Sequence, residues 1–147
     1  MKYAQDEMRG LYFEDLKEGM TGSFEKTITD TDIIAFADIT GDTNPIHLNE
    51  KFASETIFKG RIAHGMLTAS FISTVIGTKM PGPGCIYVSQ NLRFMAPVPI
   101  GAIVNARCTV TKLVPEKYFV EMSTICMVKR TQVLVGEATI LVPSRIS

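Results

Sequence analysis

The stretch from residue 63 to residue 78 places the strongest constraint on how this chain can fold. His64 is its only side chain that can carry charge, and large apolar residues recur at helical spacing on most of its faces. A helix that is apolar nearly all round must be enclosed by other structure. Two prolines and two glycines between residues 79 and 84 predict where the helix ends.

The sequence that follows can supply this enclosure. Residues 102–111 alternate between apolar and polar side chains, which is the period of a half-buried β-strand. Residues 118–129 and 133–142 continue as strands rich in β-branched side chains, with hairpin connections predicted at residues 115–117 and 130–132. We therefore predict an α+β fold in which an antiparallel β-sheet wraps around one long central helix.

A capping helical segment is predicted before the central helix. We expect a strand near residues 22–28, and then a helix that Thr29 can cap and Gly41 can end. A further short helix should begin at Asn49, and residues 42–47 should form the loop between the two.

Composition limits the classes of function. The 147 residues suffice for a single domain spanning residues 1–147, and 46% hydrophobic against 20% charged residues favours a folded chain. With 15 basic and 15 acidic residues and no basic run, nucleic acid is not expected as the main partner. The three cysteines form no CxxC pair, so neither a zinc site nor a disulfide framework is expected. No signal peptide or membrane-spanning stretch is recognisable, and we expect a soluble cytoplasmic protein.

An acid, an amide and an imidazole lie within six residues, at Asp42, Asn44 and His47. Pro45 stiffens this segment, and a turn of this length can bring the acid and the imidazole close enough to hold one water molecule. A carboxylate can take a proton from that water, and an imidazole can pass a proton to a substrate. The same residues are also good turn formers, because Asp and Asn side chains bond to their own backbone, and the sequence leaves that alternative open.

The start of the apolar helix carries a second candidate feature, His64 followed by Gly65. The first turn of a helix has unpaired N–H groups and partial positive charge, and a glycine would let a carbonyl oxygen approach them. Ser73 lies eight residues after Gly65 on roughly the same helix face, where it could orient water or substrate. A purely structural role is open for each of these three residues, through close packing or a local hydrogen bond.

These segments resemble the MaoC-like, or hydratase 2, family of (R)-specific enoyl-CoA hydratases. The family motif is matched without a gap from Phe36, through residues 39–42 and 44–47, to Ala53. Further similarity lies in residues 64–70, 81–87 and 136–138, and the resemblance covers residues 11–143. It implies a hot-dog fold, with an antiparallel sheet around one long helix and an overhanging helical segment, that forms a homodimer or a dimer of dimers.

The resemblance also implies a reaction, the reversible addition of water to trans-2-enoyl-CoA thioesters. Asp42 and His47 would be the catalytic pair, with Asn44 supporting the water or the loop. We expect Asp42 as the base and His47 as the acid, and the reverse assignment is open. No metal and no cofactor is expected, because coenzyme A is part of the substrate and the thioester supplies the activation.

Substrate-binding residues follow from the same resemblance. The N–H of Gly65 would bind the thioester carbonyl, and Ser73 and His64 would be further substrate-binding residues.

Three alternative functions concern the same class of substrate. A 3-hydroxyacyl-ACP dehydratase of fatty-acid synthesis would differ only in its carrier, and the choice depends on basic residues near the substrate site; the candidates are Lys59, Arg61, Lys79 and Arg93. A hot-dog acyl-CoA thioesterase would need a carboxylate near the central helix, but residues 63–78 contain no Asp or Glu. A non-catalytic acyl-thioester-binding subunit is disfavoured because Asp42 and His47 are both present.

Overall fold

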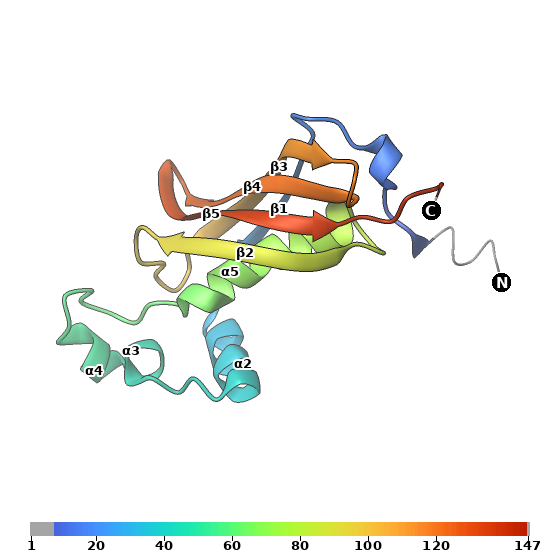
Figure 1. The fold of residues 1–147 in the computed structure, drawn as a ribbon. Coiled ribbons are helices and arrows are strands. Elements are labelled where there is room, and N and C mark those ends of the chain that lie inside the picture. Colours follow the sequence, from blue (N-terminus) through green and yellow to red (C-terminus); the bar gives the residue numbers. More distant parts are fainter. Residues whose placement is uncertain (1–7, 147) are drawn as a thin grey trace.

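The computed structural model describes residues 8–146, which build a five-stranded antiparallel sheet with a helix packed along one face (Figure 1). The strand order is β1-β3-β4-β5-β2, and every neighbouring pair is antiparallel. The strands are β1 (Thr21–Thr27), β2 (Ile86–Phe94), β3 (Ile103–Val114), β4 (Phe119–Val128) and β5 (Thr131–Leu141). The predicted α+β fold, with a sheet wrapped around a central helix, is confirmed.

The central helix is α5 (Gly65–Thr74), which continues through a π-helical turn, η2 (Val75–Lys79). Its sheet-facing side chains are buried and mostly large: Leu67, Ala69, Phe71, Ile72, Val75 and Ile76. Positions 66, 70, 73 and 77 form an exposed stripe along the helix. The sheet of the same chain therefore supplies only part of the expected enclosure, because it covers only the sides of the helix that face it.

The inner face of the sheet shows the predicted period of two. Its buried side chains on β3 and β4 are Val104, Ala106, Cys108, Val110, Val120, Met122, Thr124 and Cys126. The turn between β4 and β5 lies at residues 129–130 rather than at the predicted 130–132. Lys129 adopts a positive φ of 55°, which allows a tight two-residue connection.

A helical segment between β1 and α5 overhangs the start of α5 and contains α2 (Asp30–Thr40), α3 (Pro45–Leu48) and α4 (Glu50–Ser54) (Figure 1). Thr29 caps α2, and Gly41 ends it with a φ of 79°, as predicted. The predicted cap of α4 is confirmed too, because the Asn49 side chain accepts a hydrogen bond from the Phe52 N–H. Within residues 8–146, no helix is long and apolar enough to cross a bilayer.

The predicted loop over residues 42–47 is wrong for its last three residues. Asn44 caps α3 and Pro45 occupies its first position, so that His47 lies on a short helix. Proline is favoured there because it has no N–H to leave unpaired and its φ already suits a helix. The acid and the imidazole thus come from different local structures, a loop and a helical turn.

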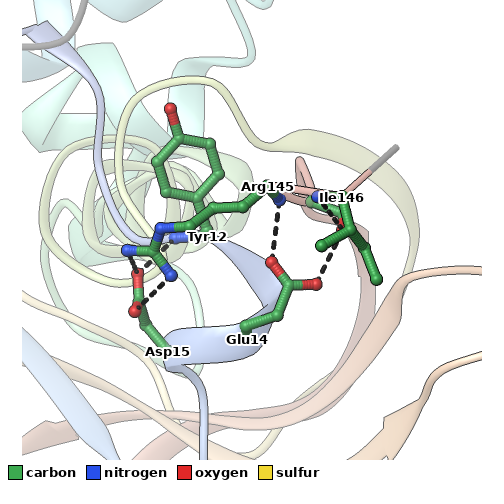
Figure 2. Close-up of polar contacts among 6 residues, drawn as sticks. Tyr12, Glu14, Asp15, Arg145 and Ile146 are labelled. Atoms are coloured by element: carbon green, nitrogen blue, oxygen red, sulfur yellow. Dashed lines mark hydrogen bonds and ion pairs between the residues drawn. The ribbon is translucent and has the colours of Figure 1, made fainter.

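The C-terminal residues are clamped onto the short helix η1 (Phe13–Asp15), as Figure 2 shows. Arg145 donates two hydrogen bonds of 2.8 Å to the Asp15 carboxylate, and its guanidinium lies 4.6 Å from the centroid of the Tyr12 ring. Glu14 accepts hydrogen bonds from the Ser144 hydroxyl and the Arg145 N–H. These bonds hold the pKa of both carboxyls below the ordinary values, mainly through Ser144 for Glu14 and through Arg145 for Asp15.

Candidate active site

A cavity of about 500 Å³ lies where the overhanging segment meets the start of α5 and the loop that follows β2. Most of its wall is apolar, and its four polar lining side chains are Asp42, His47, His64 and Thr68. One side-chain atom from each of Asp42, His47 and His64 lies within 4.8 Å of the other two. The structure therefore brings together three of the residues that the sequence singled out.

His47 is fixed by the segment that leads into α5. It is 8% exposed, and its Nδ1 lies 2.8 Å from the carbonyl oxygen of Ile62. A carbonyl oxygen can only accept, so Nδ1 carries the hydrogen and Nε2 is the nitrogen left to exchange a proton. Arg61 donates from Nε to the carbonyl oxygen of His47 at 2.6 Å and pairs through Nη2 with Asp30 at 2.6 Å. Both the ring and the backbone of His47 are thus tied to residues 61–62.

The environment of His47 favours its neutral form. Burial lowers the pKa of His47 below its ordinary value of 6.5, and the neighbouring His64 acts in the same direction. The hydrogen bond to Ile62 and the Asp42 carboxylate oppose this effect without cancelling it. The lowered pKa of His47 favours, at pH 7, a neutral imidazole with a lone pair on Nε2. This favours His47 as the base, the reverse of the assignment expected from the sequence.

His64 connects the Asp42 loop to the start of α5. Its ring is 1% exposed, its Nε2 donates to the backbone carbonyl oxygen of Asp42 at 3.0 Å, and it stacks on His47 with ring centroids 4.0 Å apart. The Phe36 ring contacts it as well, at a centroid distance of 4.8 Å. His64 therefore has the structural role that the sequence left open. Its Nδ1 has no hydrogen-bond partner within residues 8–146, and the substrate-binding role of His64 stays a prediction.

The two stacked imidazoles do not converge on a metal ion. A transition metal lies close to the plane of each imidazole that binds it, at about 2.1 Å from the nitrogen. The rings of His47 and His64 are inclined by only 30° with centroids 4.0 Å apart, so their planes do not meet that close to both nitrogens. A water molecule between the Asp42 carboxylate and Nε2 of His47 needs only two hydrogen bonds, each of about 2.8 Å. The donor set suits a water better than a metal.

Asn44 and Ser73 lie outside the lining of the cavity. The Asn44 side chain accepts the N–H of Ile46 at 3.1 Å and so shapes the turn between the acid and the imidazole. Ser73 is exposed in the stripe on α5, about 12 Å along the helix axis from Gly65. Their expected contacts with water or substrate stay predictions.

Gly65 is the first residue of α5 and lines the cavity. A Cβ at this position would lie 2.6 Å from Cε1 of Phe94, so the Phe94 ring occupies the space that a side chain would need. Close packing therefore accounts for the glycine. Gly65 precedes the first amides of α5 that bond to a carbonyl of the helix start, those of Leu67 and Thr68, so the Gly65 N–H can also donate to a ligand.

The four basic residues considered for carrier recognition lie in different places. Arg61 is engaged by Asp30 and the His47 carbonyl, and its side chain is only 15% exposed. Arg93 lines a groove on the sheet face away from α5, and Lys79 ends η2. Lys59 alone combines exposure with a place beside the cavity, next to the lining residue 58.

Sequence reasoning missed Thr68, a hydroxyl-bearing residue of the cavity lining. Thr68 lies three residues after Gly65 and four after His64, which places all three within one helical turn. This spacing favours Thr68 over Ser73 and was available in the sequence. Sequence reasoning also missed Phe94. This residue ends β2, which pairs with β5, and its ring lies beside Gly65. No neighbouring residue in the sequence predicts that contact.

Comparison with known proteins identifies the family. A family model described as a MaoC like domain matches residues 14–135. The chain belongs to the MaoC-like domain family. The MaoC-like chain is 58% identical over 134 residues to an (R)-specific enoyl-CoA hydratase of Rhodospirillum rubrum, covering 91% of this chain and 93% of that protein.

Two further relatives agree with this family. A 3-hydroxybutyryl-CoA dehydratase of Methylorubrum extorquens is 50% identical, covering 95% of this chain and 88% of that protein. Among solved structures, the unliganded R-hydratase PhaJ1 of Pseudomonas aeruginosa superposes with a TM-score of 0.88 and 39% identity, covering 92% of this chain and 88% of that chain. The family and the hot-dog fold implied by the sequence motifs are confirmed.

Proposed function

We propose that this MaoC-like protein is an (R)-specific enoyl-CoA hydratase, a hydro-lyase that adds water reversibly to trans-2-enoyl-CoA. The observation that carries the proposal is the pairing of Asp42 with His47 in an apolar cavity that ends at the first turn of α5. The names of the two curated relatives denote the two directions of this reaction, hydration and dehydration.

The catalytic pair handles one water molecule. The Asp42 carboxylate accepts one hydrogen of the water and orients it, and Nε2 of the neutral His47 accepts the other. As the water oxygen attacks C3, its proton passes to Nε2 and negative charge moves onto the thioester oxygen. Nε2 then delivers that proton to C2, which restores the neutral imidazole and places the hydroxyl and the hydrogen on the same face of the double bond.

The thioester oxygen lies at the first turn of α5 in this proposal. There the N–H of Gly65 donates to it, and the positive end of the helix dipole favours the charge that develops on the enolate. The apolar wall keeps bulk water away, which strengthens both interactions. The conjugated thioester supplies the electrophile, so the proposed reaction uses no metal and no cofactor.

We also propose that the protein acts as a homodimer. Strand β2 is an edge of the sheet, and its first residues Ile86, Tyr87 and Val88 are exposed. An exposed apolar edge strand is normally paired or covered, and pairing with a second copy would do this. Light scattering should then give twice the chain mass of 16.2 kDa. The three free cysteines suit the reducing conditions of the cytoplasm, which is the location we propose.

The function is tested by the loss of the conjugated-thioester absorbance when purified protein meets crotonyl-CoA. We expect rapid loss without release of free thiol. The variants Asp42→Asn and His47→Gln should each lose at least about 100-fold in kcat, as removal of an acid–base group does. Analysis of the product on a chiral column should give the (R)-3-hydroxy isomer.

Asp38→Asn is the matched control, because Asp38 is an exposed acid on α2 outside the cavity lining and its loss should leave activity unchanged. Release of free CoA would instead assign the protein as a thioesterase. Activity only on acyl carrier protein thioesters would assign it as a carrier-protein dehydratase. Wild-type activity in both active-site variants would refute the role of the pair.

A further inference from the structure

Thr68 carries a buried hydroxyl that nothing in the protein satisfies. Its side chain is 2% exposed and lines the cavity, yet its Oγ1 has no hydrogen-bond partner within residues 8–146. A second buried threonine, Thr124, provides the contrast, because Nε2 of Gln90 lies 2.9 Å from its Oγ1. A buried hydroxyl without a partner destabilises a fold, and a ligand that accepts its hydrogen bond would remove that cost.

The position of Thr68 on α5 brings its side chain close to the first turn of the helix. Side chains on an α-helix lean toward its N-terminus, and residues three apart lie on one face. The Thr68 side chain therefore leans toward Gly65. Its backbone N–H is already bonded to the carbonyl oxygen of His64 at 3.3 Å, which leaves the hydroxyl as the free polar group of this residue.

The chemistry of the neighbouring groups limits what the hydroxyl can bind. His64 uses its Nε2–H on the Asp42 carbonyl, so its remaining ring nitrogen can only accept. Asp42 and Nε2 of His47 also present acceptors to the cavity. Among the polar side chains of the lining, Thr68 is the one free to donate to a substrate oxygen while the pair holds its water.

We propose that the Thr68 hydroxyl is a second hydrogen-bond donor to the thioester oxygen, beside the N–H of Gly65. The proposal rests on the hydratase function proposed above and deepens it. A single backbone donor leaves one lone pair of the developing enolate oxygen without a partner, and a hydroxyl one turn further along the same helix supplies it. Because the negative charge exists only as the reaction proceeds, this bond strengthens in the transition state and acts on kcat more than on KM.

The test compares Thr68→Val, which keeps the shape and removes the hydroxyl, with Thr68→Ser, which keeps the hydroxyl. We expect Thr68→Val to lower kcat for crotonyl-CoA hydration by about 100-fold, near the lower end of the effect of removing one such donor, with little change in KM. Thr68→Ser should retain most of the activity. Thr68→Val should keep or raise the melting temperature, whereas Thr124→Val, which removes a partnered hydroxyl, should lower it.

Ligand binding gives a second measurement that does not depend on turnover. Acetoacetyl-CoA can bind as its enolate, which has its own ultraviolet absorbance, whereas butyryl-CoA has no such form. Thr68→Val should bind the enolate about 10-fold more weakly and should bind butyryl-CoA as wild type does.

Several outcomes would overturn the proposal. Unchanged kcat and enolate affinity in Thr68→Val, or equal losses in the Val and Ser variants, would show that the hydroxyl does not contact the oxygen. A lower melting temperature in Thr68→Val, with equal weakening of both ligands, would mean that the hydroxyl holds a structural water. If the wild-type protein hydrates no enoyl-CoA, the hydratase function and this inference both fail. If the wild type is active and Thr68→Val has the same kcat, only the inference fails.

Discussion

Arg61 is predicted to hold the imidazole of His47 in place through the backbone of that residue, and Arg61→Met tests this. The side chain is 15% exposed and donates to the carbonyl oxygen of His47 at 2.6 Å, while its outer nitrogen pairs with Asp30. Methionine keeps much of the apolar stem and removes both polar contacts. Asp30→Asn is the matched control, because it removes the ionic partner and leaves the bond to His47.

The two contacts differ in expected strength. A hydrogen bond from a charged donor to a buried carbonyl contributes about 1.5–3 kcal/mol, because its loss leaves the carbonyl unpaired. The Asp30 side chain is 57% exposed, so its ion pair contributes only about 0–1 kcal/mol. We therefore expect Arg61→Met to cost about 2–3 kcal/mol and Asp30→Asn less than about 1 kcal/mol. At about 2–4 °C per kcal/mol, the melting temperature should fall by roughly 4–12 °C in the first variant.

Measurement of kcat on the folded variant separates an effect on the position of His47 from an effect on the stability of the fold. Displacement of a catalytic group by about 1 Å can cost up to about 100-fold in rate, and we expect at least a 10-fold loss of kcat in Arg61→Met at a temperature where it is folded. KM should change little, since Arg61 is outside the cavity lining. Equal melting temperatures for the two variants, or full kcat in folded Arg61→Met, would refute the reasoning.

Three further predictions concern single groups. The kcat/KM for hydration should fall at acid pH, because protonation of Nε2 removes the proposed base and burial places the pKa of His47 below 6.5. An acid limb centred above 6.5 would contradict this. Gly65→Ala should lower activity, because the new Cβ would lie 2.6 Å from Phe94 and must displace its ring; adding Phe94→Leu should recover the lost melting temperature. Arg145→Ala should lower the melting temperature at pH 7, and this effect should shrink as the pH falls through the lowered pKa of Asp15. The folded-state pKa of Asp15 is held below 3.8, so the stabilisation from its bonds to Arg145 is present above pH 3.8 and is lost as the pH falls through the lowered pKa. A difference in melting temperature between wild type and Arg145→Ala that stays constant with pH would contradict this prediction.

Elements with a strong periodic signal were predictable from the sequence. The alternation in β3 and the capping box of α2 each depend on a few neighbouring residues, and both predictions hold in the structure. Helix α3 was missed because four residues are too few to show a helical period, although its Asn-Pro start is a helix signal by itself. A short element is better recognised from its cap than from its periodicity.

The candidate site was predictable in part. Asp42 and His47 lie close together in the chain, and their proximity follows from one short turn. The carbonyl of Ile62 that fixes the tautomer of His47 and the Phe94 ring against Gly65 come from distant segments. Only the tertiary fold specifies such contacts, and the proposal of His47 as the base depends on them.

The overhanging segment is fastened to the start of α5 where it carries Asp42 and His47. Bonds from the ring of His47 to Ile62 and from the ring of His64 to Asp42 tie the catalytic loop to the helix start. Exposed apolar side chains form another part of the cavity lining: Phe58, Met66, Phe94 and Met95. We expect an acyl thioester to enter past these side chains, while the two hydrogen bonds keep Asp42 and His47 together.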